Sequence, residues 1–114
     1  MVVYSFNVTT DAGEIPGKTN LPRHPELFPP MPNPFNAQAT IRYALPKSGE
    51  IRLQIFDILG REVQTLFSGF QKAGQHQITW TAADRRGTPL ASGIYFAVLK
   101  TGDIAVSQKL VLVK

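Results

Sequence analysis

Few residues in this sequence have side chains suited to catalysis. The 114 residues include two histidines, His24 and His76, and no cysteine. A hydrolytic triad needs a nucleophile, a histidine base and an orienting carboxylate. His24 lies among prolines that cannot hold it rigidly, and His76 alternates with Ile78 and Trp80 on an expected inward strand face. We therefore expect no catalytic residues and no enzyme activity.

Two aspartates could instead form the carboxylate pair of a glycoside hydrolase. Each begins an Asp-x-x-Gly sequence, at Asp57 and at Asp84. Aspartate at the first turn position bonds to its own turn backbone, and glycine at the fourth position tolerates positive φ. A calcium site would need six or more oxygen ligands, and two arginines follow Asp84 directly. We interpret both segments as turns and expect no metal and no cofactor.

The composition is that of one folded domain. Apolar residues make up 43% of the chain and charged residues 18%, enough for a core. The net charge of +4 comes from scattered basic residues, with Arg85-Arg86 as the one adjacent pair, so we expect no nucleic-acid partner. No apolar run approaches the roughly 20 residues of a transmembrane segment. The first 20 residues lack a signal-peptide pattern, so export would require a longer precursor.

Proline divides the chain. Seven of its nine prolines lie between residues 16 and 34. Because proline lacks a donor and biases its predecessor toward extended backbone, we expect a proline-rich linker over residues 16–36. Residues 2–8 have the pattern of a short strand. We therefore interpret residues 1–15 as either a strand-like tail of a preceding region or an edge strand. Residues 37–114 are the expected domain.

Short runs of alternating apolar residues follow residue 39, separated by turns. The runs cover 40–45, 51–55, 61–68, 76–80, 94–99 and 104–113. Their length and spacing predict an all-β fold, a small antiparallel immunoglobulin-like β-sandwich of six to seven strands. The adjacent Leu66 and Phe67 predict a bulge. The run at 94–99 is apolar on both faces, as a central strand is.

Three aromatic residues have specific expected places. Trp80 shares the alternation of Ile78 and is expected in the core. Phe56 alternates with polar residues and is therefore the candidate surface aromatic. Tyr95 stands where a sandwich tyrosine closes a corner by bonding to upstream backbone.

A series of motifs carries a family likeness. Pro32-Asn33-Pro34-Phe35-Asn36 is followed by Asp57-Ile58-Leu59-Gly60-Arg61, by Ser92-Gly93-Ile94-Tyr95 and by Lys109-Leu110-Val111-Leu112-Val113-Lys114. From Pro32 to Lys114 the chain resembles the C-terminal sorting domain of type IX (Por) secretion cargo. It is also similar to the immunoglobulin-like domain of flagellar hook-capping proteins.

The resemblance implies a non-catalytic domain of a larger secreted protein from Bacteroidetes-type bacteria. Cargo would be linked at its N-terminal side, cross the periplasm, and reach the cell surface or medium through the outer-membrane type IX machinery. The positions that match the family are candidate sorting residues: Pro32, Pro34, Gly93, Tyr95, Lys109, Leu110, Val111, Leu112, Val113 and Lys114. Ala37 replaces a proline that family members often carry, and cleavage at this point stays open.

The last run supplies a physical basis for recognition. A terminal strand at a sheet edge offers unpaired backbone groups to a partner. Two alternatives remain. A carbohydrate-binding or adhesive module would need two or more exposed aromatics, of which the sequence offers Phe56. An assembly module like the hook cap would self-associate through sheet edges, and an edge-strand dimer is left open.

Overall fold

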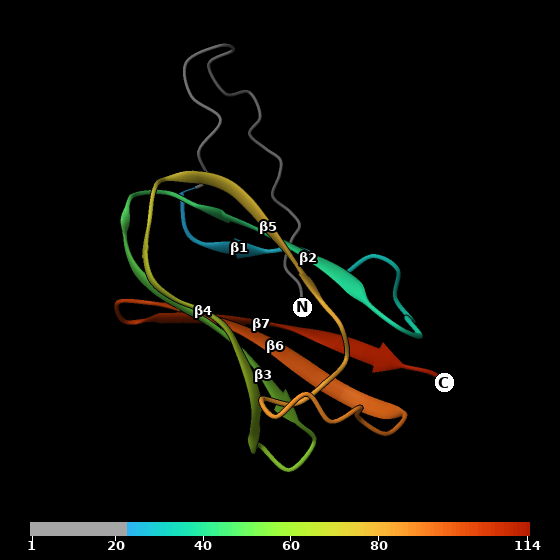
Figure 1. The fold of residues 1–114 in the computed structure, drawn as a ribbon. Coiled ribbons are helices and arrows are strands. Elements are labelled where there is room, and N and C mark those ends of the chain that lie inside the picture. The colour runs from blue at the N-terminus through green and yellow to red at the C-terminus, as the bar shows by residue number, and fades with distance from the viewer. Residues whose placement is uncertain (1–22) are drawn as a thin grey trace.

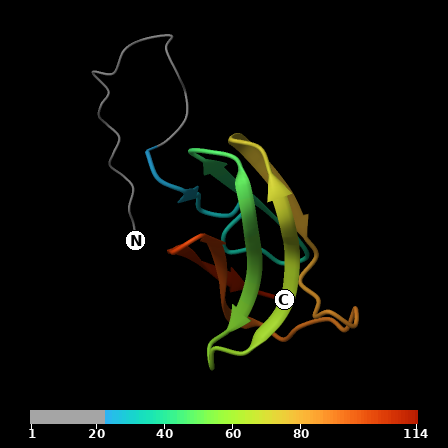
Figure 2. The same cartoon turned by 90° about the vertical axis from the view of Figure 1, so that its left-hand side faces the viewer.

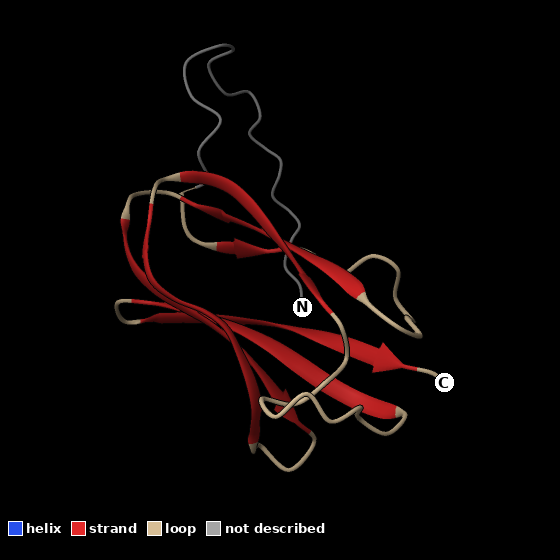
Figure 3. Ribbon diagram, viewed as in Figure 1, coloured by secondary structure: helices blue, strands red, loops and turns tan. Residues whose placement is uncertain are grey.

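The computed structural model describes residues 23–114, so the expectation for residues 1–15 lies outside the described part. All regular structure in residues 23–114 is strand (Figure 3). The seven strands are β1 (Glu26–Leu27), β2 (Ala39–Leu45), β3 (Gly49–Asp57), β4 (Glu62–Gln71), β5 (Gly74–Trp80), β6 (Gly93–Thr101) and β7 (Ile104–Leu112).

The strands form two facing sheets (Figure 1). One sheet has the order β1-β2-β5 and the other the order β4-β3-β6-β7, with every neighbouring pair antiparallel. β3 and β4 run side by side as a long hairpin before the chain enters β5 of the other sheet (Figure 2). The predicted antiparallel sandwich is confirmed, and β6 is a central strand as expected.

The core lies between the sheets and follows the alternation of the sequence. Successive strand residues point to opposite faces, so every second residue of a strand enters the same layer. The largest fully buried side chains come from both sheets and from the segment before β2: Phe35, Ile41, Leu45, Leu53, Ile55, Leu99, Leu110 and Leu112. This burial supplies the main favourable term for folding.

Irregular pairing between β3 and β4 confirms the predicted bulge. Leu53 pairs with Phe67 and Gln54 pairs with Thr65, which leaves Leu66 as the extra residue. A second shift follows between Ile55 and Phe56. Bulges bend a strand and increase its twist, and here Leu66 and Phe67 both pack against the core.

The expected linker is in part wrong, because residues 23–36 belong to the sandwich. Glu26 pairs with Ala44 and Leu27 with Tyr43, and Leu27 is buried. Phe35 is 1% exposed. Proline is compatible with an edge strand because the missing N–H would face away from the sheet. Residues 16–22 lie outside the described part of the chain.

Candidate recognition site

The segment that precedes β2 meets the end of β7 at one edge of the four-stranded sheet. We call residues Asn33–Phe35 the clasp. The Phe35 N–H donates to Val111 O at 2.9 Å, and the Val113 N–H donates to Phe35 O at 2.8 Å. Phe35 thereby forms a parallel bridge opposite Leu112. In Figure 1 the loop before β2 runs beside the red end of β7.

The Asn33 side chain extends this pairing by one step. Its Nδ2 donates to Lys109 O at 3.3 Å, and its Oδ1 accepts from Val111 N at 3.0 Å. An amide side chain carries both a donor and an acceptor, so it can replace a backbone peptide at a sheet edge. β7 is the edge strand that the sequence predicted, but its C-terminal half does not offer the unpaired groups that were expected.

Phe35 anchors the clasp in the core. Its ring centroid lies 5.7 Å from that of Trp80 at 50°, and Trp80 lies 6.1 Å from Tyr95 at 70°. Such tilted and edge-on arrangements are favourable for aromatic pairs. Trp80 is buried as predicted, and its Nε1 donates to Ala83 O at 3.1 Å.

The chain before β6 holds the end of β7 on its other side. The Tyr95 hydroxyl donates to Ala91 O at 2.7 Å, which confirms the predicted corner. The Lys114 N–H donates to Ser92 Oγ at 3.0 Å. Burial raises the pKa of Tyr95 above its ordinary value, and the Asp57 carboxylate raises it further.

Gly93 has a backbone role at the start of β6. It pairs with Leu112, two positions from the pair of Tyr95 with Leu110. Its φ of +156° lies in a region that L side chains rarely adopt, while a Cβ there would meet nothing within 4 Å. The need for glycine is therefore torsional.

The structure brings the sequence-predicted sorting residues together where the start of β6, the end of β7 and the segment around the clasp meet, and burial divides them. Leu110 and Leu112 are core residues with 0% and 1% exposure. A partner can touch the exposed members of the set without unfolding the domain: Pro32, Pro34, Lys109, Val113 and Lys114. Their role in recognition stays a prediction. Sequence reasoning missed Asn33 and Phe35, although Phe35 stands out as an aromatic among prolines.

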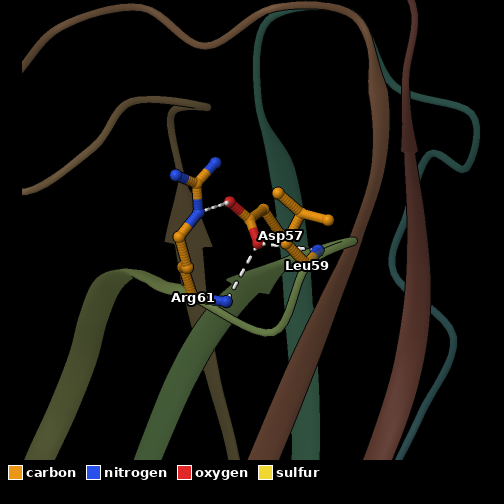
Figure 4. A network of polar contacts seen from close by, with 3 residues as sticks. All are labelled: Asp57, Leu59 and Arg61. Carbon is orange, nitrogen blue, oxygen red and sulfur yellow. Dashed lines mark hydrogen bonds and ion pairs between the residues drawn. The ribbon is translucent and has the colours of Figure 1, made fainter.

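The Asp57 turn is built as predicted (Figure 4). Asp57 Oδ1 accepts from the N–H of Leu59 and of Arg61 at 2.9 Å each, and Arg61 Nε donates to Oδ2 at 3.0 Å. These contacts, led by the Arg61 backbone N–H, lower the pKa of the Asp57 carboxyl. Gly60 completes the turn at φ +84°.

The Asp84 turn repeats this arrangement. Asp84 Oδ1 accepts from the N–H of Arg86 and of Thr88 at 2.9 Å each, and Gly87 has φ +86°. Both aspartates thus bond the backbone two and four residues further on. This geometry confirms the interpretation of both segments as turns.

Each of the two histidines has its own local contacts. The His76 ring stacks on Tyr43 with centroids 5.4 Å apart, and its Nε2 lies 2.8 Å from Lys72 O. His24 Nδ1 lies 3.2 Å from Pro25 O. Within residues 23–114 no three His, Cys, Asp or Glu side chains gather to hold a metal ion. No helix in the described chain is long and apolar enough to cross a membrane.

Phe56 lies on the outer face of the four-stranded sheet. It is half-buried, and Lys100 Nζ lies 5.7 Å from its ring centroid. The half-buried Phe96 is its direct partner on β6. Sequence reasoning missed Phe96 as an outer-face aromatic because its strand is apolar on both sides. On the same face of β3, Gln54 is 5% exposed, and its Oε1 has no partner among the described residues.

The fold and this edge define an immunoglobulin-like β-sandwich whose N-terminal segment closes onto its last strand. The chain belongs to the family of FlgD Ig-like domains, whose family profile matches residues 35–103. That match includes Phe35 and ends before β7.

Two solved structures from Porphyromonas gingivalis share the fold. Dimeric latent PorU has a TM-score of 0.60 at 19% identity, over 78% of this chain and 9% of PorU. PorZ, an essential surface component of the type IX secretion system, has a TM-score of 0.50 at 18% identity, over 79% of this chain and 11% of PorZ. This chain thus spans about a tenth of either protein. No curated protein matches the sequence.

Proposed function

We propose that this domain is a non-catalytic C-terminal sorting domain. It directs a larger cargo protein, linked at its N-terminal side, through the outer-membrane type IX translocon to the cell surface or medium. The observation that carries the proposal is the pairing of the clasp with Lys109–Val113. The fold shared with PorZ, a surface component of that secretion system, supports it.

The clasp suits a signal that is read in the folded state. Asn33 and Val111 are 78 residues apart in the chain, so the surface that they share forms only when the sandwich has folded. An unfolded cargo tail would not present it. A translocon that binds this surface would therefore accept folded domains and leave unfolded ones behind.

The exposed members of the edge indicate the chemistry of the partner. Lys109 and Lys114 are exposed cations, and Val113, whose N–H bonds to Phe35 O of the clasp, is 50% exposed. A complementary surface would combine an apolar contact with acidic side chains. Leu110 and Leu112 support this surface from inside the core.

The test is export of a reporter that carries a Sec signal and this full chain at its C-terminus, in a bacterium with a working type IX system. The variant Val113→Ser with Lys114→Ala changes exposed edge residues. The matched control, Ile58→Ser with Leu59→Ser, changes residues that are 68% and 72% exposed at the β3–β4 turn, which β6 separates from β7. We expect periplasmic retention of the edge variant and export of the control. Equal export of both, with the domain folded, would overturn the proposal.

A carbohydrate-binding or adhesive module is the second candidate, favoured by one observation. Phe56 and Phe96 are cross-strand neighbours on the outer face, which supplies the second aromatic that a sugar platform requires. This candidate predicts a glycan-array signal that Phe56→Ala and Phe96→Ala abolish while Phe70→Ala, at a 59% exposed site, keeps it. Absence of any signal would remove it.

A further inference from the structure

The N-terminal half of the β7 edge differs from the half that the clasp covers. The clasp bonds Lys109 O, both backbone groups of Val111, and Val113 N. The backbone N–H and C=O groups of odd-numbered β7 residues therefore point away from β6. β7 pairs with β6 without a register shift, so the outward groups of Ala105 and Ser107 point the same way. No hydrogen bond within residues 23–114 uses them.

This open stretch has fixed limits. The clasp closes the edge from Lys109 onward, and the turn at Gly102-Asp103 ends it on the other side. An added strand therefore has one short window, centred on Val106. Open edge groups of this kind are templates for pairing with another chain.

We propose that a second copy of this chain adds to this window in the antiparallel sense, with Val106 on the two-fold axis. Ala105 then lies opposite Ser107 of the second copy. Each such pair exchanges two N–H···O bonds. The two-fold symmetry repeats the Ala105–Ser107 pair on both sides of the axis. The two four-stranded sheets become one continuous sheet across the axis.

Charge and apolar contact favour a second copy over an unrelated strand. The same register sets Asp103 opposite Lys109 of the second copy, twice, and both residues are exposed. Val106 meets its own equivalent at the non-hydrogen-bonded position, where side chains are closest. Ile104, which is 46% exposed, is covered beside Gln108 of the second copy. The window is thus complementary to itself.

The register has no near alternative. A shift of one residue would place backbone groups that point away from β6 in one copy opposite residues of the other copy whose backbone groups already bond to β6. A shift of two residues toward the C-terminus would pair Ala105 with Lys109 and require Lys109 O, which already accepts from Asn33. A shift of two residues the other way would pair Ser107 with Asp103, which lies in the turn before β7. This inference does not depend on the proposed sorting function, because it uses the edge that the clasp leaves open.

The lack of cysteine in the chain makes the register directly testable. In the proposed pair the two Val106 Cα atoms lie about 4.5 Å apart, within the roughly 4.4–6.8 Å range of a disulfide. Oxidation of the full chain carrying Val106→Cys should give a covalent dimer. Ile104→Cys is the control, because its two copies would lie about 14 Å apart along the strands. Cross-linking of the Ile104→Cys variant to an equal extent, or of neither variant, would overturn the proposal.

Charge reversal tests the same pairing without cysteine. Asp103→Lys and Lys109→Asp each place like charges opposite each other, so sedimentation velocity should show dimer content reduced at least several-fold in either variant. The double variant restores opposite charges and should restore the dimer. A purely monomeric wild-type chain at all concentrations, or a double variant as weak as the singles, would rule the pairing out.

Discussion

Asp57 uses a single carboxylate to bond two backbone N–H groups and one guanidinium. Its pKa is lower in the folded chain than its ordinary value. A carboxyl of this kind stabilises the fold at pH values above its unfolded pKa of about 3.9. That stabilisation is lost as the pH falls through the lower, folded-state pKa.

We therefore expect Asp57→Asn to destabilise the domain at neutral pH and to have a smaller effect in acid. Urea unfolding between pH 7 and pH 3 measures the difference in free energy of unfolding between wild type and variant. This difference should shrink below about pH 4, because the unfolded carboxyl begins to protonate there while the folded carboxyl, with its lower pKa, is still ionised. A difference that stays constant across the range would contradict the assignment.

A substitution at Tyr95 can remove the hydrogen bond at the corner without removing the packing of the ring. Tyr95→Phe keeps the ring next to Trp80 and removes the hydroxyl bond to Ala91 O. We expect a loss of about 1 kcal/mol in the free energy of unfolding. Denaturant melts of both proteins measure it. An unchanged midpoint would show that solvent satisfies the Ala91 carbonyl equally well.

At the scale of elements, the clasp depends on the Asn33 side chain, whose amide bonds to β7 as a backbone peptide would. Asn33→Ala removes the bonds to Lys109 O and Val111 N, whereas the Phe35 bonds to Val111 O and Val113 N remain. We expect about 1 kcal/mol of destabilisation. The amide of Val111 should exchange with solvent faster, while that of Val113 stays protected.

Asn36→Ala is the matched control, at an exposed asparagine three residues further along. Amide hydrogen exchange followed by NMR distinguishes the two positions. Equal protection of Val111 in wild type and Asn33→Ala would show that the side chain contributes nothing to the edge.

The strands that the sequence predicted share a local signal. Ile41, Tyr43 and Leu45 alternate with polar or small residues, and all three enter the core. The adjacent Leu66 and Phe67 can both pack inward only if the strand bulges, and β4 does so. Period-two patterns and turn chemistry are local, so one sequence suffices to find them.

The missed elements depend on contacts between distant residues. β1 has two residues, too few for a period, and it lies between prolines. The clasp is visible only once β7 is in place, because Asn33 bonds a strand 76 to 78 residues away. Of the candidate site, the sequence indicated Pro32, Pro34 and the terminal strand, but not the pairing that joins them.

For the whole molecule, the domain begins earlier than its alternating strands suggest. Phe35 is 1% exposed and touches the aromatic core. Phe35→Ala should cost about 3–5 kcal/mol, a large part of the roughly 5–15 kcal/mol that stabilises a typical domain. Thermal unfolding measures the effect.

The control for Phe35 is another phenylalanine of the same sandwich. Phe70 is 59% exposed, so Phe70→Ala should change stability by less than about 0.5 kcal/mol. Similar losses at the two positions would show that Phe35 is not part of the domain core.

The parallel sense of the clasp also decides how the domain resists force. The segments around Phe35 and Leu112 run in the same direction. If the chain is pulled before Asn33 and, in the opposite direction, at Lys114, one segment slides along the other. Sliding loads the bonds at Val111 and Val113 together instead of one at a time. The domain should therefore resist a force applied between these two ends more strongly than a force that separates the bonds one after another. Single-molecule stretching from the two ends should show a rupture force that falls in Asn33→Ala.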